Sequence, residues 1–180
     1  MTAYVALLRA VNLAGHNRVA MPDLLGVLAD LGFAGGQSLL QSGNLVFQSD
    51  SRSADELEWL LERETVRRLG LRTDYLVRSA AEWRTIIDRN PFPEEAARDP
   101  SHLLVVALKK APDEHGVAAL QAAIQGPEYL RAEGAQLYVV YPAGIGRSKL
   151  TTTVIERTLN AQGTGRNWNT VLKLAERLDV

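Results

Sequence analysis

The sequence contains no cysteine, which excludes disulfides, thiolate metal sites, iron–sulfur clusters and cysteine nucleophiles. Aromatic residues make up only 6% of the chain, and the predicted strands lack the aromatic pattern of an RNA-recognition module. A formal net charge of −1 provides no overall field to attract nucleic acid or a membrane surface. Nucleic acid is therefore disfavoured as a partner, and any anion site must come from local clustering of basic residues.

Long hydrophobic runs are also missing. The first residues are apolar, but no basic leader precedes them and Arg9 ends the run, which fits neither a secretory signal nor a membrane-spanning segment. We therefore expect a cytoplasmic protein without a membrane partner. His16, His102 and His115 show no ligand spacing, so no metal site is predicted, and no familiar hydrolase motif is present. The sequence identifies no reaction, no cofactor and no oligomeric state.

The periodicity of apolar residues predicts the same order of elements in each half of the chain. In the first half we expect strands at 4–12, 37–41, 45–49 and 72–78, and helices at 21–31, 53–70 and 79–88. In the second half we expect strands at 102–109, 128–132 and 136–141, an extended piece near 166–168, and helices at 112–124, 149–160 and 170–178.

This βαββαβ order is typical of a ferredoxin-like α+β module, an antiparallel sheet with helices over one face. We predict two such modules, at residues 1–92 and 101–180, each with a trailing helix. The acidic, proline-containing stretch 93–100 is the predicted connector between them. The duplication is inferred from element order, because the two halves share negligible sequence similarity.

The first candidate cluster is polar and follows the first predicted strand. It contains Arg9, Asn12, Asn17 and Arg18, in a connection longer than a strand–helix joint requires. Alternatively, this is a surface loop whose asparagines bond to their own backbone. Arg9 interrupts an apolar run, so it needs a partner if it is buried, and an internal carboxylate would serve as well as a ligand.

The second candidate cluster is the turn at 41–44, with Ser42 and Asn44 as its candidate ligand groups. As a tight hairpin turn it needs no function. However, a βαββαβ module places this turn and the loop after the first strand at the same end of the sheet. We therefore expect the first two clusters to share a rim.

The third candidate cluster is the glycine-containing stretch 142–149, placed before a predicted helix and carrying Arg147, Ser148 and Lys149. Open backbone, a helix N-terminus and positive charge are the ingredients of a phosphate site. The stretch matches neither a Walker A loop nor a dinucleotide fingerprint, and Ser148 could simply cap the helix. Arg166 and Asn167 form a weaker companion cluster, with Asn169 as the expected helix cap.

Four segments, at 8–15, 41–47, 144–150 and 165–171, resemble the bacterial family called domain of unknown function 1697. The resemblance covers nearly the whole chain. It implies a duplicated ferredoxin-like fold and brings no established activity. Ala14 and Asn17 stand where the family would have glycine and often lysine, so the first loop carries less charge than is typical.

Two hypotheses follow. In the first, the clusters form one polar site between the two halves and recognise a small molecule bearing a phosphate or carboxylate. In the second, the protein is a structural or protein-interaction module with no small-molecule ligand. The candidate ligand-binding residues are Arg9, Asn12, Asn17, Arg18, Ser42, Asn44, Arg147, Ser148, Lys149, Arg166 and Asn167.

Overall fold

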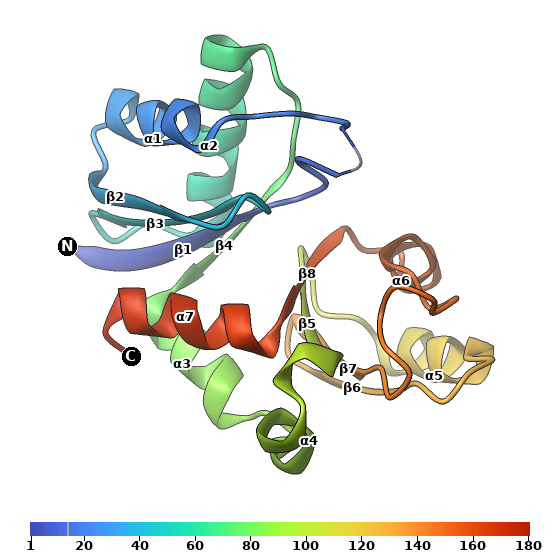
Figure 1. Cartoon of the computed structure of the whole chain (residues 1–180). Coiled ribbons are helices and arrows are strands. Elements are labelled where there is room, and N and C mark those ends of the chain that lie inside the picture. The colour runs from blue at the N-terminus through green and yellow to red at the C-terminus, as the bar shows by residue number, and fades with distance from the viewer. Residues whose placement is uncertain (14) are drawn as a thin grey trace. The chain divides into compact units, whose positions relative to one another are not determined.

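The computed structural model describes residues 1–13 and 15–180, which divide into two compact units, each built on a four-stranded antiparallel sheet (Figure 1). The first unit contains residues 1–85 and 174–180, and the second contains residues 86–173. The predicted α+β class with two βαββαβ halves is confirmed. Ala14, which the family resemblance singled out, lies outside the described residues.

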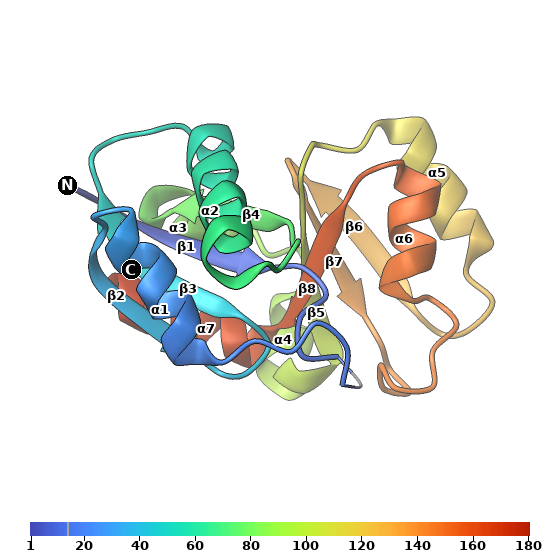
Figure 2. The same ribbon diagram turned by 90° about the horizontal axis from the view of Figure 1, so that it is seen from above.

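The first unit has its strand β1 at the centre of the sheet, in the order β2-β3-β1-β4. The helices α1 and α2 lie side by side over one face of this sheet (Figures 1 and 2). The elements are β1 Thr2–Leu8, α1 Met21–Asp30, β2 Ala34–Leu39, β3 Asn44–Ser49, α2 Ala54–Leu69, β4 Tyr75–Ser79 and the trailing helix α3 Ala80–Asp88.

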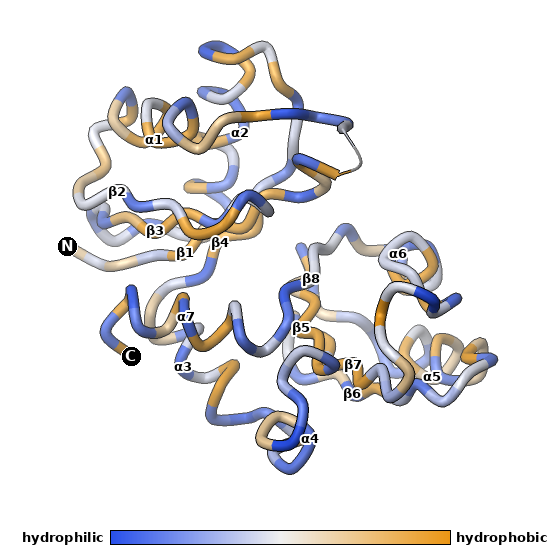
Figure 3. The backbone as a smooth tube through the Cα atoms, in the orientation of Figure 1, coloured by the Kyte–Doolittle hydropathy of each residue, from blue (hydrophilic) through white to orange (hydrophobic). Residues whose placement is uncertain are grey.

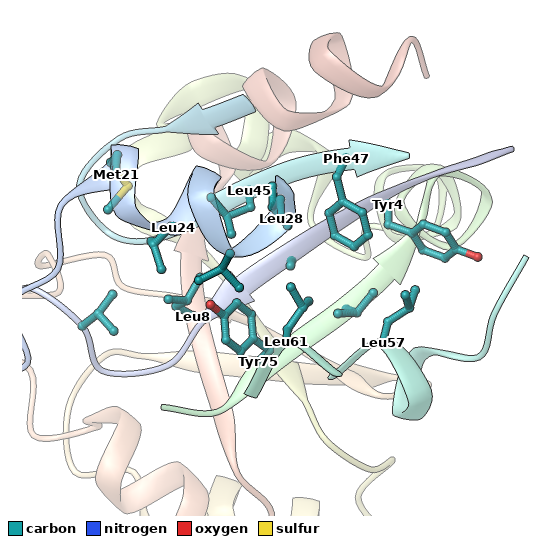
Figure 4. Packing of buried hydrophobic residues seen from close by; sticks show 14 residues of the cluster. Tyr4, Leu8, Met21, Leu24, Leu28, Leu45, Phe47, Leu57, Leu61 and Tyr75 are labelled. Carbon is teal, nitrogen blue, oxygen red and sulfur yellow. The ribbon is translucent and has the colours of Figure 1, made fainter. Parts of the chain in front are cut away.

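Alternation along β1 builds the core of the first unit, because successive side chains of a strand point to opposite faces. Tyr4, Ala6 and Leu8 face α1 and α2, where they join Leu24 and Leu61 in a fully buried cluster (Figure 4). The hydroxyls of Thr65 in α2 and Tyr75 in β4 are 2.8 Å apart in this core, which satisfies both polar groups.

Two glutamates of α2 cover the edge of the first sheet. β4 is an edge strand, so its outward N–H groups lack a strand partner. Glu58 Oε1 accepts from the Val77 N–H at 2.8 Å, and Glu62 Oε1 accepts from the Tyr75 N–H at 3.0 Å. Glu58 and Glu62 are four residues apart, about one helical turn, and this rise is close to the length of two strand residues. Both glutamates therefore lie on one face of α2 and reach the N–H groups of Val77 and Tyr75 along the edge of β4.

Ser53 caps the N-terminus of α2. Ser53 Oγ accepts from the Glu56 N–H at 3.2 Å, and the helix ends at Leu69, with Gly70 as its C-cap in the left-handed conformation. Ser79 and Glu82 form a capping box at the start of α3, since each side chain accepts from the other residue's backbone N–H.

Replacing Ser53 with alanine is expected to lower the free energy of unfolding by about 1 kcal/mol, because one N–H at the start of α2 loses its acceptor. Ser51→Ala is the matched control, since Ser51 is exposed and precedes the helix. Urea unfolding followed by circular dichroism measures both. Equal stability of the two variants would contradict the assigned cap.

The second unit repeats this topology in the order β6-β7-β5-β8, with α5 and α6 side by side on one face of the sheet (Figure 2). Its central strand β5 is apolar and buried along its whole length (Figure 3). The elements are α4 Pro93–Arg98, the 3₁₀ turn η1 Pro100–His102, β5 Leu103–Leu108, α5 Glu114–Ala123, β6 Tyr129–Glu133, β7 Gln136–Val140, α6 Thr152–Leu159, β8 Gly163–Asn167 and α7 Trp168–Leu178.

The repeat extends to individual hydrogen bonds. Glu156 of α6 accepts from the Gly163 N–H at 2.9 Å, as Glu62 of α2 does from the Tyr75 N–H. Tyr75 and Gly163 are both the first residues of the last strand of their sheets. The two halves therefore share an edge-covering contact that their negligible sequence similarity does not reveal.

Several predicted element bounds were wrong. β1 ends at Leu8 instead of continuing to Asn12, because Ala10 and Asn12 adopt positive φ, which no strand accommodates. Gly35, expected after the first helix, lies in β2 beside an irregularity in the pairing with β3. The last helix begins at Trp168, and Asn167 rather than Asn169 accepts from the Thr170 N–H.

The helix expected from Lys149 begins at Thr152. Thr151 Oγ1 accepts from the Val154 N–H at 3.3 Å and so caps the helix in place of Ser148. Leu150 is buried in the core of the second unit, which fixes the chain just before this cap. Residues 93–100, the predicted connector, include the short helix α4.

The C-terminal segment 174–180 belongs to the first unit, where Arg177 of α7 donates to Gln37 of β2 at 2.7 Å. Within the described part of the chain, no helix is long and apolar enough to cross a bilayer.

Candidate functional site

Asn12 holds the loop after β1 against the turn between β2 and β3. Its Nδ2 donates to the carbonyls of Gln41 at 2.7 Å and Val19 at 3.1 Å, and its Oδ1 accepts from the Val19 N–H at 2.9 Å. The expectation that the first two clusters share a rim is confirmed by this contact. Because both the nitrogen and the oxygen of its side-chain amide are hydrogen-bonded, Asn12 positions the loop.

The turn at 41–44 is shaped by its own polar groups. The buried Asn44 donates from Nδ2 to the Leu39 carbonyl at 2.7 Å and to Ser42 Oγ at 2.9 Å. The Gly43 carbonyl accepts from the Leu8 N–H at 2.9 Å, which fastens the turn to the end of β1. Ser42 and Asn44 therefore fix the shape of the rim.

Backbone strain is concentrated in the loop after β1 and in the connection between β2 and β3. Of the six non-glycine residues described with positive φ, four lie here: Ala10, Asn12, Asn17 and Leu40. Asn17 supports this geometry by donating from Nδ2 to the Ala10 carbonyl at 3.0 Å. Each left-handed residue costs on the order of 1 kcal/mol, and such outliers collect at functional sites. The surrounding hydrogen bonds offset this cost.

A cavity of about 590 Å³ opens beside this loop, a size common among small-molecule sites. We call it the α1 pocket, because it lies at the N-terminus of α1. Leu69 and Leu71 give it an apolar side, and Arg18 and Asp23 give it opposite charges. Its lining residues are Asn12, Gly15, Arg18, Val19, Ala20, Asp23, Gln41, Leu69 and Leu71.

Arg18 is the positive charge of the α1 pocket. It is exposed, and it makes no hydrogen bond or ion pair with any residue that the structure describes. Its Nη2 lies 3.4 Å from the position that a Cβ on Gly15 would take, so the guanidinium packs where that residue lacks a side chain. The N-terminus of α1 adds its partial positive charge, and Ala20 supplies no side-chain cap there.

Arg9, the other basic residue of the first cluster, pairs with Asp74 at 3.1 Å. The backbone strengthens this link, because the Arg9 N–H donates to the Asp74 carbonyl and Thr73 Oγ1 donates to the Arg9 carbonyl. Asp74 is thus the internal carboxylate that the sequence analysis allowed as a partner for Arg9. Arg9 is not among the lining residues of the α1 pocket.

The third cluster lies in the second unit, in the loop before α6. Ser148 Oγ donates to Glu128 Oε1 at 2.5 Å and accepts from the Leu150 N–H at 3.0 Å. Lys149 Nζ is 3.5 Å from Gln125 Oε1, and Arg147 is exposed. Because the helix begins later than predicted, these residues do not meet its free N–H groups.

Arg166 is buried in β8, where it donates from Nη1 to Thr164 Oγ1 at 2.7 Å and to the Gly165 carbonyl at 2.8 Å. Burial lowers the pKa of its guanidinium to about 10. Arg78 holds the same position in the other sheet: it lies opposite Val5, as Arg166 lies opposite Val105. Burial lowers the pKa of Arg78 as well. Asn167 accepts from the Thr170 N–H and so caps α7.

Sequence reasoning missed Asp23, Leu69 and Leu71 as lining residues of the α1 pocket. Asp23 follows Pro22 in the first turn of α1, a position that signals helix initiation rather than a site. Leu69 and Leu71 flank the C-cap of α2 and reach the pocket only through tertiary folding. Among the described residues, no three histidine, aspartate or glutamate side chains gather as a metal site.

Comparison with known proteins supports the fold. Residues 1–138 match the family described as "Protein of unknown function (DUF1697)". The whole chain superposes on 99% of the conserved bacterial protein SP0830 from Streptococcus pneumoniae, with a TM-score of 0.75 and 22% sequence identity. That likeness establishes the shared fold alone. No curated protein matches the sequence of the chain.

Proposed function

Because the chain belongs to the DUF1697 family, whose description names no activity, we propose from the geometry of the first unit that the α1 pocket binds a small organic anion bearing a phosphate or a carboxylate. The observation that carries this proposal is Arg18, which lines a cavity of about 590 Å³ without a partner among the described residues. A guanidinium in this setting favours an oxyanion, which it can bind through two parallel hydrogen bonds.

The remaining lining residues narrow the class of ligand that the α1 pocket would bind. Leu69 and Leu71 favour an apolar body beside the anionic group. Asp23 is an acceptor at the same cavity, so a hydroxyl or amine on the ligand would be matched there. Asn12 supports the rim of the pocket by donating from its side chain to the backbone carbonyl of Gln41.

Binding is tested by thermal unfolding of the full chain with hexyl phosphate or hexanoate, and with inorganic phosphate as the anion without an apolar body. We expect at least one of the first two probes to raise the midpoint by a few degrees at about ten times its Kd. Arg18→Gln is expected to abolish this rise without changing the midpoint of the free protein, because Arg18 holds no other described residue.

Arg84→Gln is the matched control, since it removes the same charge from an exposed position of α3 outside the α1 pocket. Its response to the probes is expected to equal that of the unchanged protein. Stabilisation that persists in Arg18→Gln, or no stabilisation by either apolar anion, would sink the proposal.

A further inference from the structure

A second cavity, of about 440 Å³, lies between α2 and the segment that leads into β4. We call it the Trp59 groove. It shares no lining residue with the α1 pocket, and no pattern in the sequence indicates it. Its lining residues are Trp59, Glu62, Arg63, Val66, Arg72, Thr73 and Asp74.

An exposed tryptophan dominates this groove. Trp59 keeps 55% of its surface exposed, whereas Trp83 and Trp168 keep 1% and 6%. Val66, two helical turns further along α2, is also exposed and lines the same groove. The Arg63 guanidinium carbon lies 4.2 Å from the centroid of the Trp59 ring. A ring backed by a guanidinium and open to solvent is a stacking platform for a planar group.

The charges of the groove favour an anion. Asp74 is paired with Arg9 at 3.1 Å, and Glu62 accepts from the Tyr75 N–H at 3.0 Å, so both carboxylates are engaged. Arg72 is exposed and has no hydrogen bond or ion pair with a residue that the structure describes. Arg63 has its guanidinium over the Trp59 ring and makes no hydrogen bond or ion pair with a residue that the structure describes. Two guanidinium groups are thus available on one small cavity.

We propose that the Trp59 groove binds an aromatic ring that carries a phosphate, with the ring stacked on Trp59 beside Val66 and the phosphate held by Arg72 and Arg63. The doubly charged phosphate matches two guanidinium groups, and the cavity is large enough for a ligand the size of a nucleoside monophosphate. This site is independent of the α1 pocket and does not rest on its proposed function.

Quenching of tryptophan fluorescence tests the site, because Trp59 is the exposed tryptophan of the chain. The probe is AMP. Adenosine supplies the ring without the phosphate, and ribose 5-phosphate supplies the phosphate without the ring. We expect saturable quenching by AMP, at least about fivefold weaker binding of adenosine, and no quenching by ribose 5-phosphate.

Two variants assign the effect to its residues, and two others serve as controls. Trp59→Leu removes the fluorophore as well as the platform, so its AMP binding is measured by titration calorimetry and is expected to be lost. Arg72→Gln is expected to weaken AMP binding about tenfold, as loss of one charge-assisted contact implies. Arg84→Gln, which removes an exposed arginine outside the groove, leaves binding unchanged. Arg18→Gln is also expected to leave it unchanged, which separates this site from the α1 pocket.

Quenching that does not saturate with AMP would overturn the proposal, as would equal AMP affinity of Arg72→Gln and the unchanged protein. Equal affinity for adenosine and AMP would remove the phosphate from the proposed chemistry. Because Trp59 and Arg72 are exposed, circular dichroism of their variants is expected to match that of the unchanged protein, so loss of binding would not reflect unfolding.

Discussion

Glu58→Ala is expected to lower the free energy of unfolding by about 3 kcal/mol. The Val77 N–H is buried at the edge of the first sheet and donates to Glu58 Oε1 at 2.8 Å. Removing the carboxylate leaves this donor without an acceptor, which costs about 1–3 kcal/mol. Glu58 also raises the pKa of Arg78, together with Glu82, against the lowering by burial, so its loss leaves a buried cation less compensated.

Glu58→Gln is the control for this prediction, because its amide oxygen can still accept from Val77. It is expected to lose less stability than Glu58→Ala. The difference in the free energy of unfolding measures the cost of leaving the Val77 N–H without an acceptor. Urea unfolding followed by circular dichroism gives both values. A Glu58→Ala variant within about 0.5 kcal/mol of the unchanged protein would contradict the role of Glu58 at this edge.

Gly43→Ala is expected to lower the free energy of unfolding by about 2–4 kcal/mol, from two causes. Gly43 has a φ of +81°, where a side chain is strained. A Cβ there would also lie 2.8 Å from Val11 Cγ2 and 2.9 Å from Leu8 Cβ, closer than van der Waals contact allows. Because the turn is fastened to β1 at this point, the variant is also expected to disturb the rim of the α1 pocket.

Gly32→Ala separates the two causes. Gly32 has a similar φ of +73°, but no atom lies within 4 Å of the position of its Cβ. It is therefore expected to lose only the conformational part, about 1 kcal/mol. Denaturant unfolding of both variants measures the difference. Equal losses in the free energy of unfolding would show that the contacts of the added Cβ with Val11 and Leu8 cost nothing.

The fold could be predicted because its signals are local. Apolar periodicity marks each strand and helix, and Ser53 and Ser79 mark helix starts by their capping-box spacing. The errors arose where tertiary contacts override a local pattern. Thr151 rather than Ser148 caps α6, because Leu150 is drawn into the core and Ser148 bonds to Glu128.

The candidate site could be predicted only in part. The approach of the first loop to the turn at 41–44 follows from topology alone, and Asn12 confirms it. What sequence could not reveal is which polar residues are already satisfied. Asn44 and Arg9 match the pattern of ligand groups, yet Asn44 shapes its own turn and Arg9 pairs with Asp74, a residue distant in sequence.

Trp59 was missed for the opposite reason. Within α2 it reads as one more apolar residue of an amphipathic helix, and only the structure places it on the outer face while Leu57 and Leu61 point inward. Arg72 likewise lies in a segment that was expected to be a strand. Their proximity depends on how α2 packs beside β4, which no spacing in the sequence encodes.

The membership of residues 174–180 in the first unit has a consequence for synthesis on the ribosome. Chains emerge from the N-terminus, and domains generally fold as units in that order. Here the second unit ends at residue 173, so all of its residues emerge before the first unit is complete. The contact of Arg177 with Gln37 then joins the last helix to a strand made much earlier. All four strands of the first sheet are therefore synthesised early, and the first unit gains its segment 174–180 only after the whole second unit has been made.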